Sequence, residues 1–267
     1  MASAAEAAGF STLWVGEHVV MVDQGSSRYP YNDAGAIPVP ADADWLDPLL
    51  CLGFAAAVTD AITLATGVLL LPEHNPVVIA KQAATLDVLS AGRFRLGIGI
   101  GWSREEFAAL GVPFQNRGRR TAEYVKAMRE LWREDLASFS GDFVSFESIR
   151  VYPKPVRNRH LPVFFGGNSD PALERAAVHA DGWYGFNLPG VEGVRDCVAS
   201  LKERCAAAGR EHGAVELAVS VEGCEPSDLP ELERIGVDEL VLVDAPPSDA
   251  DAAAGWVHSL AGQWRVG

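Results

Sequence analysis

The chain has 267 residues, of which 48% are hydrophobic, so it is long enough to bury a full-sized core. Its 36 Asp and Glu residues outnumber its 22 Lys and Arg residues and give a formal charge of −14, which repels nucleic-acid phosphates. The densest basic stretch, with Arg117, Arg119 and Arg120, is short and is followed by Glu123. We therefore expect no nucleic-acid partner.

The cysteines and the apolar runs exclude further classes of protein. Cys51, Cys197, Cys205 and Cys224 are scattered, without a CxxC pair or a histidine at ligand spacing, which indicates neither a disulfide framework nor a metal site. The first ten residues do not have the pattern of a secretory signal, and no stretch elsewhere reaches about 18 consecutive apolar residues. The sequence predicts a cytoplasmic protein with no metal and no membrane partner.

Short β-branched runs alternate with longer helical patterns, as in the βα units of a parallel sheet. The apolar runs predict strands at residues 12–16, 62–71, 94–100, 162–166, 182–186, 215–221 and 237–243. The longer patterns predict helices at residues 47–59, 76–90, 119–133, 171–180, 191–208 and 229–235. A polar, aromatic segment at about 138–155 predicts a hairpin or excursion inserted into a single domain that spans residues 1–267.

Seven strands are one fewer than an eight-stranded barrel contains, and the shortage lies at the start of the chain. Residues 2–8 have the pattern of the last turns of a helix that ends at Gly9. A helix that opens the chain and feeds a strand implies a strand before it. We therefore expect an α/β fold of the (β/α)8 TIM-barrel type whose first strand is lacking in this chain, and the alternative is an open sheet that begins here.

A glycine-rich passage, FRLGIGIGWSREE at 94–106, joins a predicted strand to a predicted helix. Gly97, Gly99 and Gly101 lack a Cβ and so permit a cofactor or substrate to approach bare backbone. Ser103 is suited to cap a helix that carries two acids in its first turn. The spacing is G-x-G-x-G, which departs from the dinucleotide fingerprint, so this passage alone does not identify a cofactor.

Four passages carry a resemblance to a known family. They are LWVGEHVV at 13–20, TGVLLLPEHNPVVIAKQAATLDVLSAGRFRLGIGIGW at 66–102, PKPV with PVFFGG at 153–167, and ADGWYG at 180–185. In these passages the chain resembles the bacterial luciferase-like superfamily of flavin- and deazaflavin-dependent oxidoreductases, and within it the probable coenzyme F420-dependent oxidoreductases. The resemblance implies a TIM barrel of the luciferase-like type, a cofactor over the carboxyl ends of the strands, and a homodimer.

The resemblance also implies which residues meet the cofactor ring. Related deazaflavin enzymes carry a strand bulge with a non-proline cis peptide against the ring, and here Gly67 and Val68 match it. Ile100, Gly101 and Trp102 would line the phosphate or ribityl side of the same groove, with Trp102 covering the substrate. The alternative for Gly67 is an ordinary glycine in a buried strand.

The cofactor phosphate would be held by the backbone amides of Gly166, Gly167 and Asn168. These residues directly precede a helix that begins near Ser169 and Pro171, and the free amides of a helix N-terminus favour an anion. The alternative is that the two glycines form only a tight turn between strand and helix.

His18 is the candidate catalytic acid or base, because it matches the histidine beside the deazaflavin in related sugar-phosphate dehydrogenases. A neutral imidazole near pH 7 exchanges a proton with a substrate alcohol as hydride leaves or arrives. Glu17 would orient it, or the two would form a structural hydrogen-bonded pair. His74 would border the pocket.

Two further features bear on the substrate. Trp102 stands where those dehydrogenases place a glutamate, and Glu106 matches their second acid one helical turn later, so a sugar phosphate is disfavoured and an apolar or planar substrate is favoured. The long aromatic loop at residues 22–44 has the length of a lid or a binding surface.

Three functions are compatible with these observations. The favoured one is an oxidoreductase that transfers hydride between coenzyme F420 and a small organic substrate. The first alternative is an FMN-dependent luciferase-like monooxygenase, and the second is a non-catalytic binding protein derived from the same barrel.

Overall fold

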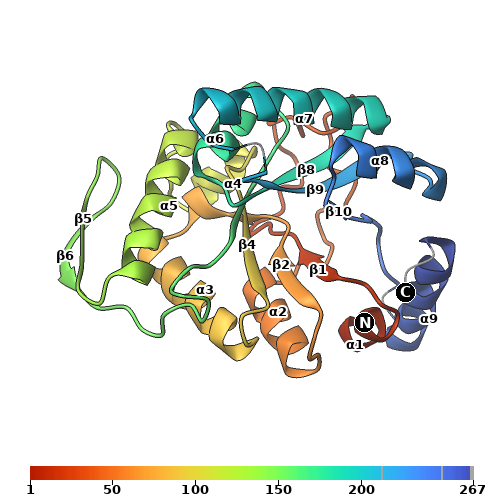
Figure 1. Ribbon diagram of the computed structural model, residues 1–267, viewed down its shortest axis with the longest axis horizontal. Coiled ribbons are helices and arrows are strands. Elements are labelled where there is room, and N and C mark those ends of the chain that lie inside the picture. The colour runs from red at the N-terminus through yellow and green to blue at the C-terminus, as the bar shows by residue number, and fades with distance from the viewer. Residues whose placement is uncertain (212, 248, 265–267) are drawn as a thin grey trace.

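The computed structural model describes residues 1–211, 213–247 and 249–264. Figure 1 shows a curled parallel sheet with helices wrapped around its outside. Its strands follow the order β1-β2-β4-β7-β8-β9-β10, and β3 also pairs with β4. The strands are β1 Thr12–Val15, β2 Thr63–Thr66, β3 Leu69–Leu70, β4 Phe94–Gly99, β7 Val163–Gly166, β8 Gly182–Pro189, β9 Glu216–Glu222 and β10 Glu239–Leu240.

All seven predicted strands are present, with changes at two of them. The strand expected at 62–71 is divided into β2 and β3, because the chain bulges at Gly67 and Val68, which are joined by a cis peptide bond. The last strand, expected at 237–243, is reduced to β10. A parallel sheet covered by helices on one face and filled with side chains on the other favours the continuous apolar runs seen in the sequence.

The helices confirm the predicted alternation and add one element. Asp47 and Asn75 cap α2 and α3 with their side chains, each ahead of a proline in the first turn. The helix α9 at the C-terminal end of the described chain was not predicted, and it contacts α1. The helices are α1 Ala2–Ala7, α2 Pro48–Ala57, η1 Leu71–Glu73, α3 Pro76–Leu89, α4 Arg104–Ala109, α5 Arg117–Arg133, α6 Asp170–His179, α7 Gly190–Ala207, η2 Pro226–Asp228, α8 Leu229–Ile235 and α9 Ala250–Trp264.

The segment predicted as a hairpin is an antiparallel pair, β5 Ala137–Ser140 and β6 Ser145–Ile149. It projects from the helical layer beside α5 (Figure 1). The carboxylate of Glu123 on α5 accepts the backbone N–H groups of the connecting turn, at 142–144, and so fixes the hairpin to the barrel.

Two apolar clusters fill the two sides of the sheet. The outer cluster lies between strands and helices and includes Trp132 and Trp183, both almost fully buried. The inner cluster lies inside the curl, where Trp14 stacks on Tyr184 with 4.9 Å between ring centroids and meets Phe164 edge-on. Removing one large apolar side chain from water contributes about 1.5–3 kcal/mol, so both clusters stabilise the curl.

The sheet is open between its two end strands, β1 and β10, which side chains connect. The Glu239 carboxylate accepts from Thr12 Oγ1 at 3.1 Å and from Trp14 Nε1 at 2.6 Å. These bonds hold the edges of a partial TIM barrel, which confirms the predicted fold class. Within the described part of the chain, no helix is both long enough and apolar enough to cross a membrane.

Candidate active site

The carboxyl ends of the parallel strands meet at one rim of the curl, which we call the mouth. In barrels of this type, the active site lies at this end. His18 follows β1, Gly67 and Val68 separate β2 from β3, and two further groups follow β4 and β7. The sequence-predicted residues that keep part of their surface exposed at the mouth are His18, Gly67, Val68, Ile100, Gly101, Trp102, Gly166, Gly167 and Asn168.

The Val68 side chain packs between the ends of the neighbouring strands. A Cβ at Gly99 would come within 2.6 Å of one Val68 methyl carbon, and a Cβ at Gly166 within 2.9 Å of the other. Both glycines are therefore required by packing against the bulge. The remaining surface of Val68 faces the mouth. The resemblance described above predicts the cofactor ring at this place.

The other glycines of the β4 passage also have packing reasons. A Cβ at Gly97 would overlap the Thr66 carbonyl oxygen at 2.0 Å. Gly101 has a φ of 71° and would meet Phe107 at 2.7 Å and a Glu73 carboxyl oxygen at 2.9 Å. The glycines at 97, 99 and 101 thus make room for atoms of the barrel itself, and the approach of a ligand to this backbone stays a prediction.

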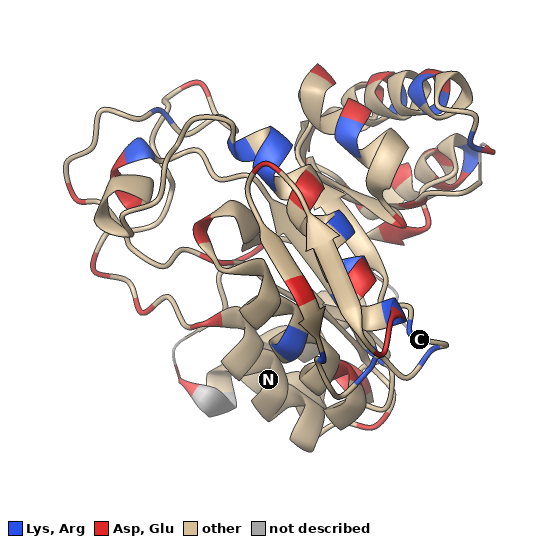
Figure 2. Ribbon diagram, turned by 90° about the vertical axis from the view of Figure 1, so that its left-hand side faces the viewer, with Lys and Arg blue, Asp and Glu red and all other residues tan. Residues whose placement is uncertain are grey.

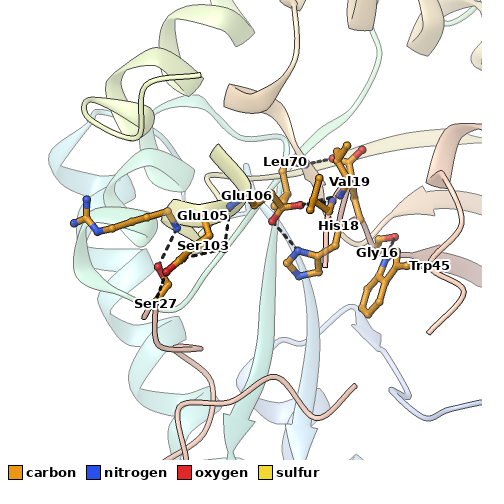
Figure 3. A network of polar contacts seen from close by, with 12 residues as sticks. Gly16, His18, Val19, Ser27, Trp45, Leu70, Ser103, Glu105 and Glu106 are labelled. Carbon is orange, nitrogen blue, oxygen red and sulfur yellow. Dashed lines mark hydrogen bonds and ion pairs between the residues drawn. The ribbon is translucent and has the colours of Figure 1, made fainter. Parts of the chain in front are cut away.

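His18 forms its close contact with Glu106. Its Nδ1 lies 2.9 Å from Glu106 Oε2, and Glu106 is fully buried at the first turn of α4 (Figure 3). The other carboxylate oxygen accepts the N–H groups of Val19 and Val20 at 2.8 and 3.1 Å. Ser103 caps α4 as predicted, because its hydroxyl accepts the Glu106 N–H. One buried acid therefore fixes both the imidazole and the chain that follows it.

Glu17 does not orient His18, contrary to the prediction. Its carboxylate accepts the Leu70 N–H at 2.6 Å and lies 3.0 Å from His74 Nε2. Successive residues of the chain after β1 point to different neighbours, so Glu17 turns toward β3 and His18 toward α4. Burial lowers the pKa of His74, but the hydrogen bond and charge of Glu17, together with the charges of Asp47 and Glu106, outweigh burial, so the pKa is raised overall.

A third acid, Glu73, lies behind Gly101. Both of its carboxyl oxygens are buried and have no hydrogen-bond partner among the residues that the structure describes. Burial, followed by the charges of Glu106 and Glu17, raises the pKa of Glu73 to about 9. Its carboxyl group is therefore neutral at pH 7. Within residues 1–211, 213–247 and 249–264, no three His, Cys, Asp or Glu side chains are arranged to hold a metal ion.

Aromatic side chains surround the imidazole. Trp45 and Trp102 meet the His18 ring edge-on, with centroids 5.2 and 5.9 Å away. Trp45 is fixed by a hydrogen bond from Nε1 to the Gly16 carbonyl oxygen (Figure 3). Tyr29 extends this wall with its ring 5.5 Å from Trp102. His18, the candidate for proton transfer, is thus surrounded by flat, apolar rings.

The long loop after β1 covers the mouth, as its length predicted. Glu105 accepts from Ser26 N–H and hydroxyl and from Ser27 N–H, and the hydrogen bonds of these serines lower the pKa of Glu105. Further along, Asn187 Nδ2 donates to the Tyr31 carbonyl oxygen, and Tyr31 meets Phe186 edge-on. The loop is therefore fastened to α4 on one side and to β8 on the other.

The predicted phosphate-binding segment is partly used by the sheet. Gly167 N–H donates to the Tyr184 carbonyl oxygen at 3.2 Å, so this amide is already paired. The Asn168 side chain bonds to both backbone groups of Phe186 and holds β8. Ser169 does not cap α6 with its side chain. Gly166 makes room for Val68, so the segment has a structural role at each residue.

A cavity of about 620 Å³ lies at the opposite end, at the amino ends of β8, β9 and β10. Asp181, Glu216 and Asp238 are among its lining residues. Since barrels of this type place chemistry at the carboxyl ends of the strands, we assign this cavity no part in the site.

Comparisons with known proteins identify the family. The sequence pattern described as luciferase-like monooxygenase matches residues 1–224. The chain belongs to the luciferase-like monooxygenase family. An uncharacterized protein of Mycobacterium tuberculosis strain H37Rv is 38% identical over 258 residues, which cover 96% of this chain and 90% of that protein.

Relatives of this luciferase-like chain include users of different cofactors. An FMNH2-dependent dimethylsulfone monooxygenase of Pseudomonas putida is 34% identical over 167 residues, covering 61% of this chain and 45% of that protein. A solved F420-dependent secondary alcohol dehydrogenase has a TM-score of 0.68 at 22% identity and covers 88% of this chain and 68% of that one. Long-chain alkane monooxygenase has the same TM-score at 18% identity, with 88% and 59% covered. The structural likenesses establish the fold alone.

Proposed function

We propose that this luciferase-like protein binds coenzyme F420 at the mouth and transfers hydride between it and a small organic substrate. The observation that carries the proposal is the bulge at Gly67 and Val68, between β2 and β3, which lies at the same rim as the His18 and Glu106 pair. The resemblance of the passage at 66–102 to F420-dependent oxidoreductases supports the cofactor. The residues present fit it, because Val68 offers an apolar surface and the tryptophans exclude water.

When bound, the deazaflavin would supply or accept the hydride. The protein supplies the proton. With Nδ1 donating to Glu106, His18 keeps Nε2 as its free nitrogen, so Nε2 takes the proton from a substrate hydroxyl or returns one to a carbonyl oxygen. Glu106 holds the ring orientation. The walls from Trp45 and Trp102 favour a planar or apolar substrate.

Fluorescence titration of the purified protein with F420 and separately with FMN tests this proposal. We expect F420 alone to bind at micromolar or tighter affinity. FMN binding would instead support the oxygen-dependent monooxygenase, which the dimethylsulfone monooxygenase relative favours. Binding of neither coenzyme would favour a non-catalytic binding protein.

The role of His18 is tested by His18→Ala with the coenzyme that binds. General acid–base catalysis contributes about 10²–10⁴-fold, so turnover should fall at least 100-fold while coenzyme affinity changes less than about threefold. Trp45→Phe, which keeps an aromatic ring beside the imidazole, is the matched control and should lose far less. Equal losses of turnover and affinity would show that His18 binds coenzyme or supports the fold.

We also propose that the protein is a homodimer through α2. Leu50, Phe54 and the C-cap residue Val58, spaced by four residues, are 69%, 81% and 59% exposed and form an apolar stripe along α2 and its end. Phe54→Glu should convert the dimer to a monomer in sedimentation experiments, whereas Glu147→Gln on the projecting hairpin should not. A wild-type monomer would contradict this proposal.

A further inference from the structure

The buried acid Glu73 is a titratable group close to the mouth that the proposed reaction does not use. It is the last residue of the short helix η1 and is only 7% exposed. Neither of its carboxyl oxygens has a hydrogen-bond partner in the part of the chain that the structure describes. An unpaired buried carboxyl group destabilises a fold, so its presence here requires an explanation.

The carboxyl group of Glu73 lies against the start of α4. Its Oε1 lies 2.9 Å from the position that a Cβ at Gly101 would take, and the Phe107 ring lies 2.7 Å from the same position. Phe107 directly follows Glu106, whose carboxylate is bonded to His18. Glu73 is therefore packed beside the turn that carries the partner of the candidate acid or base.

A second carboxylate and imidazole pair is bonded to η1 itself. Glu17 accepts the N–H of Leu70, which precedes η1, and lies 3.0 Å from Nε2 of His74, which follows it. After burial, the charges of Glu106 and Glu17 both raise the pKa of Glu73. We call these five side chains, Glu17, His18, Glu73, His74 and Glu106, the histidine–glutamate cluster.

Two helices pack against η1, and their basic side chains are bonded elsewhere. On α5, Arg117 Nε donates to a carbonyl oxygen just after β4, and Arg120 donates to two carbonyl oxygens of the loop that precedes α5. On α3, Lys81 donates to a carbonyl oxygen beyond the hairpin. Burial raises the pKa of Tyr124 on α5, so this phenol is neutral at pH 7. Among the described residues, no cation bonds to Glu73.

The charges of the cluster balance only while Glu73 keeps its proton. Glu17 is paired with His74 and Glu106 with His18, which leaves the third carboxyl group without a positive partner in the cluster. Figure 2 shows acidic and basic residues interspersed along the helices, whereas Glu73 is enclosed by the fold. Loss of its proton would place a third negative charge next to Glu106 and would attract a proton to the bonded imidazole.

We propose that Glu73 is a positioning residue that acts on His18 through Glu106. With its proton, Glu73 leaves each imidazole with one carboxylate, and without it the cluster binds the His18 proton more tightly. The inference rests on the proposed function, in which His18 exchanges a proton with the substrate. It explains why a carboxyl group without a partner is buried beside this pair.

NMR titration of the histidine rings tests the proposal in the free protein, without any coenzyme. The signal of His18, assigned with His18→Gln, is followed from pH 5 to 10.5 in the wild type and in Glu73→Gln. In the wild type we expect two steps, that of His18 itself and a smaller one near pH 9, where Glu73 loses its proton. Glu73→Gln should keep the first midpoint within about 0.3 pH unit and lack the second step. Glu147→Gln, on the projecting hairpin, is the matched control and should keep both steps.

Three results would overturn the proposal. A single step in the wild type would show that Glu73 does not act on His18. A first midpoint that falls by about one pH unit in Glu73→Gln would show that Glu73 is already ionised where His18 titrates. Unfolding of the wild type alone between pH 7 and 10, seen by circular dichroism, would assign the Glu73 proton to stability. The proposed function is decided separately, by the coenzyme titrations.

Discussion

The two ends of the barrel differ in how their charged side chains are paired. At the amino end, Arg95 lies 2.7 Å from Glu216 and 3.2 Å from Glu239, and Glu239 also accepts from Thr12 and Trp14. At the mouth, Arg104, Arg117 and Arg175 have no carboxylate partner in the described part of the chain, where the buried carboxyl group of Glu73 also has no hydrogen bond. The arginine at the amino end is paired with carboxylates, whereas the three arginines at the mouth are not paired within the described residues.

This difference separates stability from function. The partly buried network around Arg95 and Glu239 holds the edges of an open sheet, and its charges are paired within the protein. Uncompensated charges destabilise a fold, so they persist where binding or catalysis gains from them. The contrast can be tested by removing charges at each end.

The largest expected effect is at the amino end. Arg95→Met leaves two carboxylates facing each other and should lower the free energy of unfolding by about 2–3 kcal/mol. Urea denaturation measures this loss, and coenzyme affinity should stay unchanged. Arg119→Gln, which breaks an exposed pair, should cost less than about 0.5 kcal/mol. Similar losses in the two variants would refute a stabilising role for the Arg95 network.

A smaller effect that depends on pH is expected from Glu73→Gln. The folded pKa of Glu73 is raised to about 9 from an ordinary 4.5, so its contribution to stability is full below pH 4.5 and is lost as pH rises toward 9. Relative to the glutamine variant, the wild type should lose stability steadily as pH rises through this window. Denaturation curves of both proteins at pH 5, 7 and 9 measure the difference. Parallel pH dependence would show that Glu73 has partners in solution.

The smallest effect is expected at Arg175 on α6. Arg175→Gln removes one cation from a mutually repelling group, so the free energy of unfolding should stay within about 0.5 kcal/mol of wild type or rise by up to about 1 kcal/mol at low salt. Thermal denaturation at low and high salt checks this. A loss well beyond 1 kcal/mol would assign Arg175 to the structural class of Arg95.

The sequence predicted the strands because apolar periodicity is local, and the bulge at Gly67 and Val68 because its passage resembles the family. It did not predict α9, which follows a stretch of prolines and acids. It paired His18 with Glu17, its sequence neighbour, whereas the partner is Glu106, 88 residues away. Nor did the sequence indicate that Arg175 lies close to Arg117, since only the packed helices α5 and α6 bring these two residues together. Side-chain partners across elements depend on the direction in which each residue leaves its strand or helix.

Hydrogen–deuterium exchange with and without F420 tests the central claim, that the coenzyme binds at the mouth. We predict coenzyme-dependent protection in residues 66–70, 99–106 and 166–172 and none around the cavity at the amino end. Protection at 214–217 and 236–239, beside Glu216 and Asp238, with none at the mouth would contradict the account.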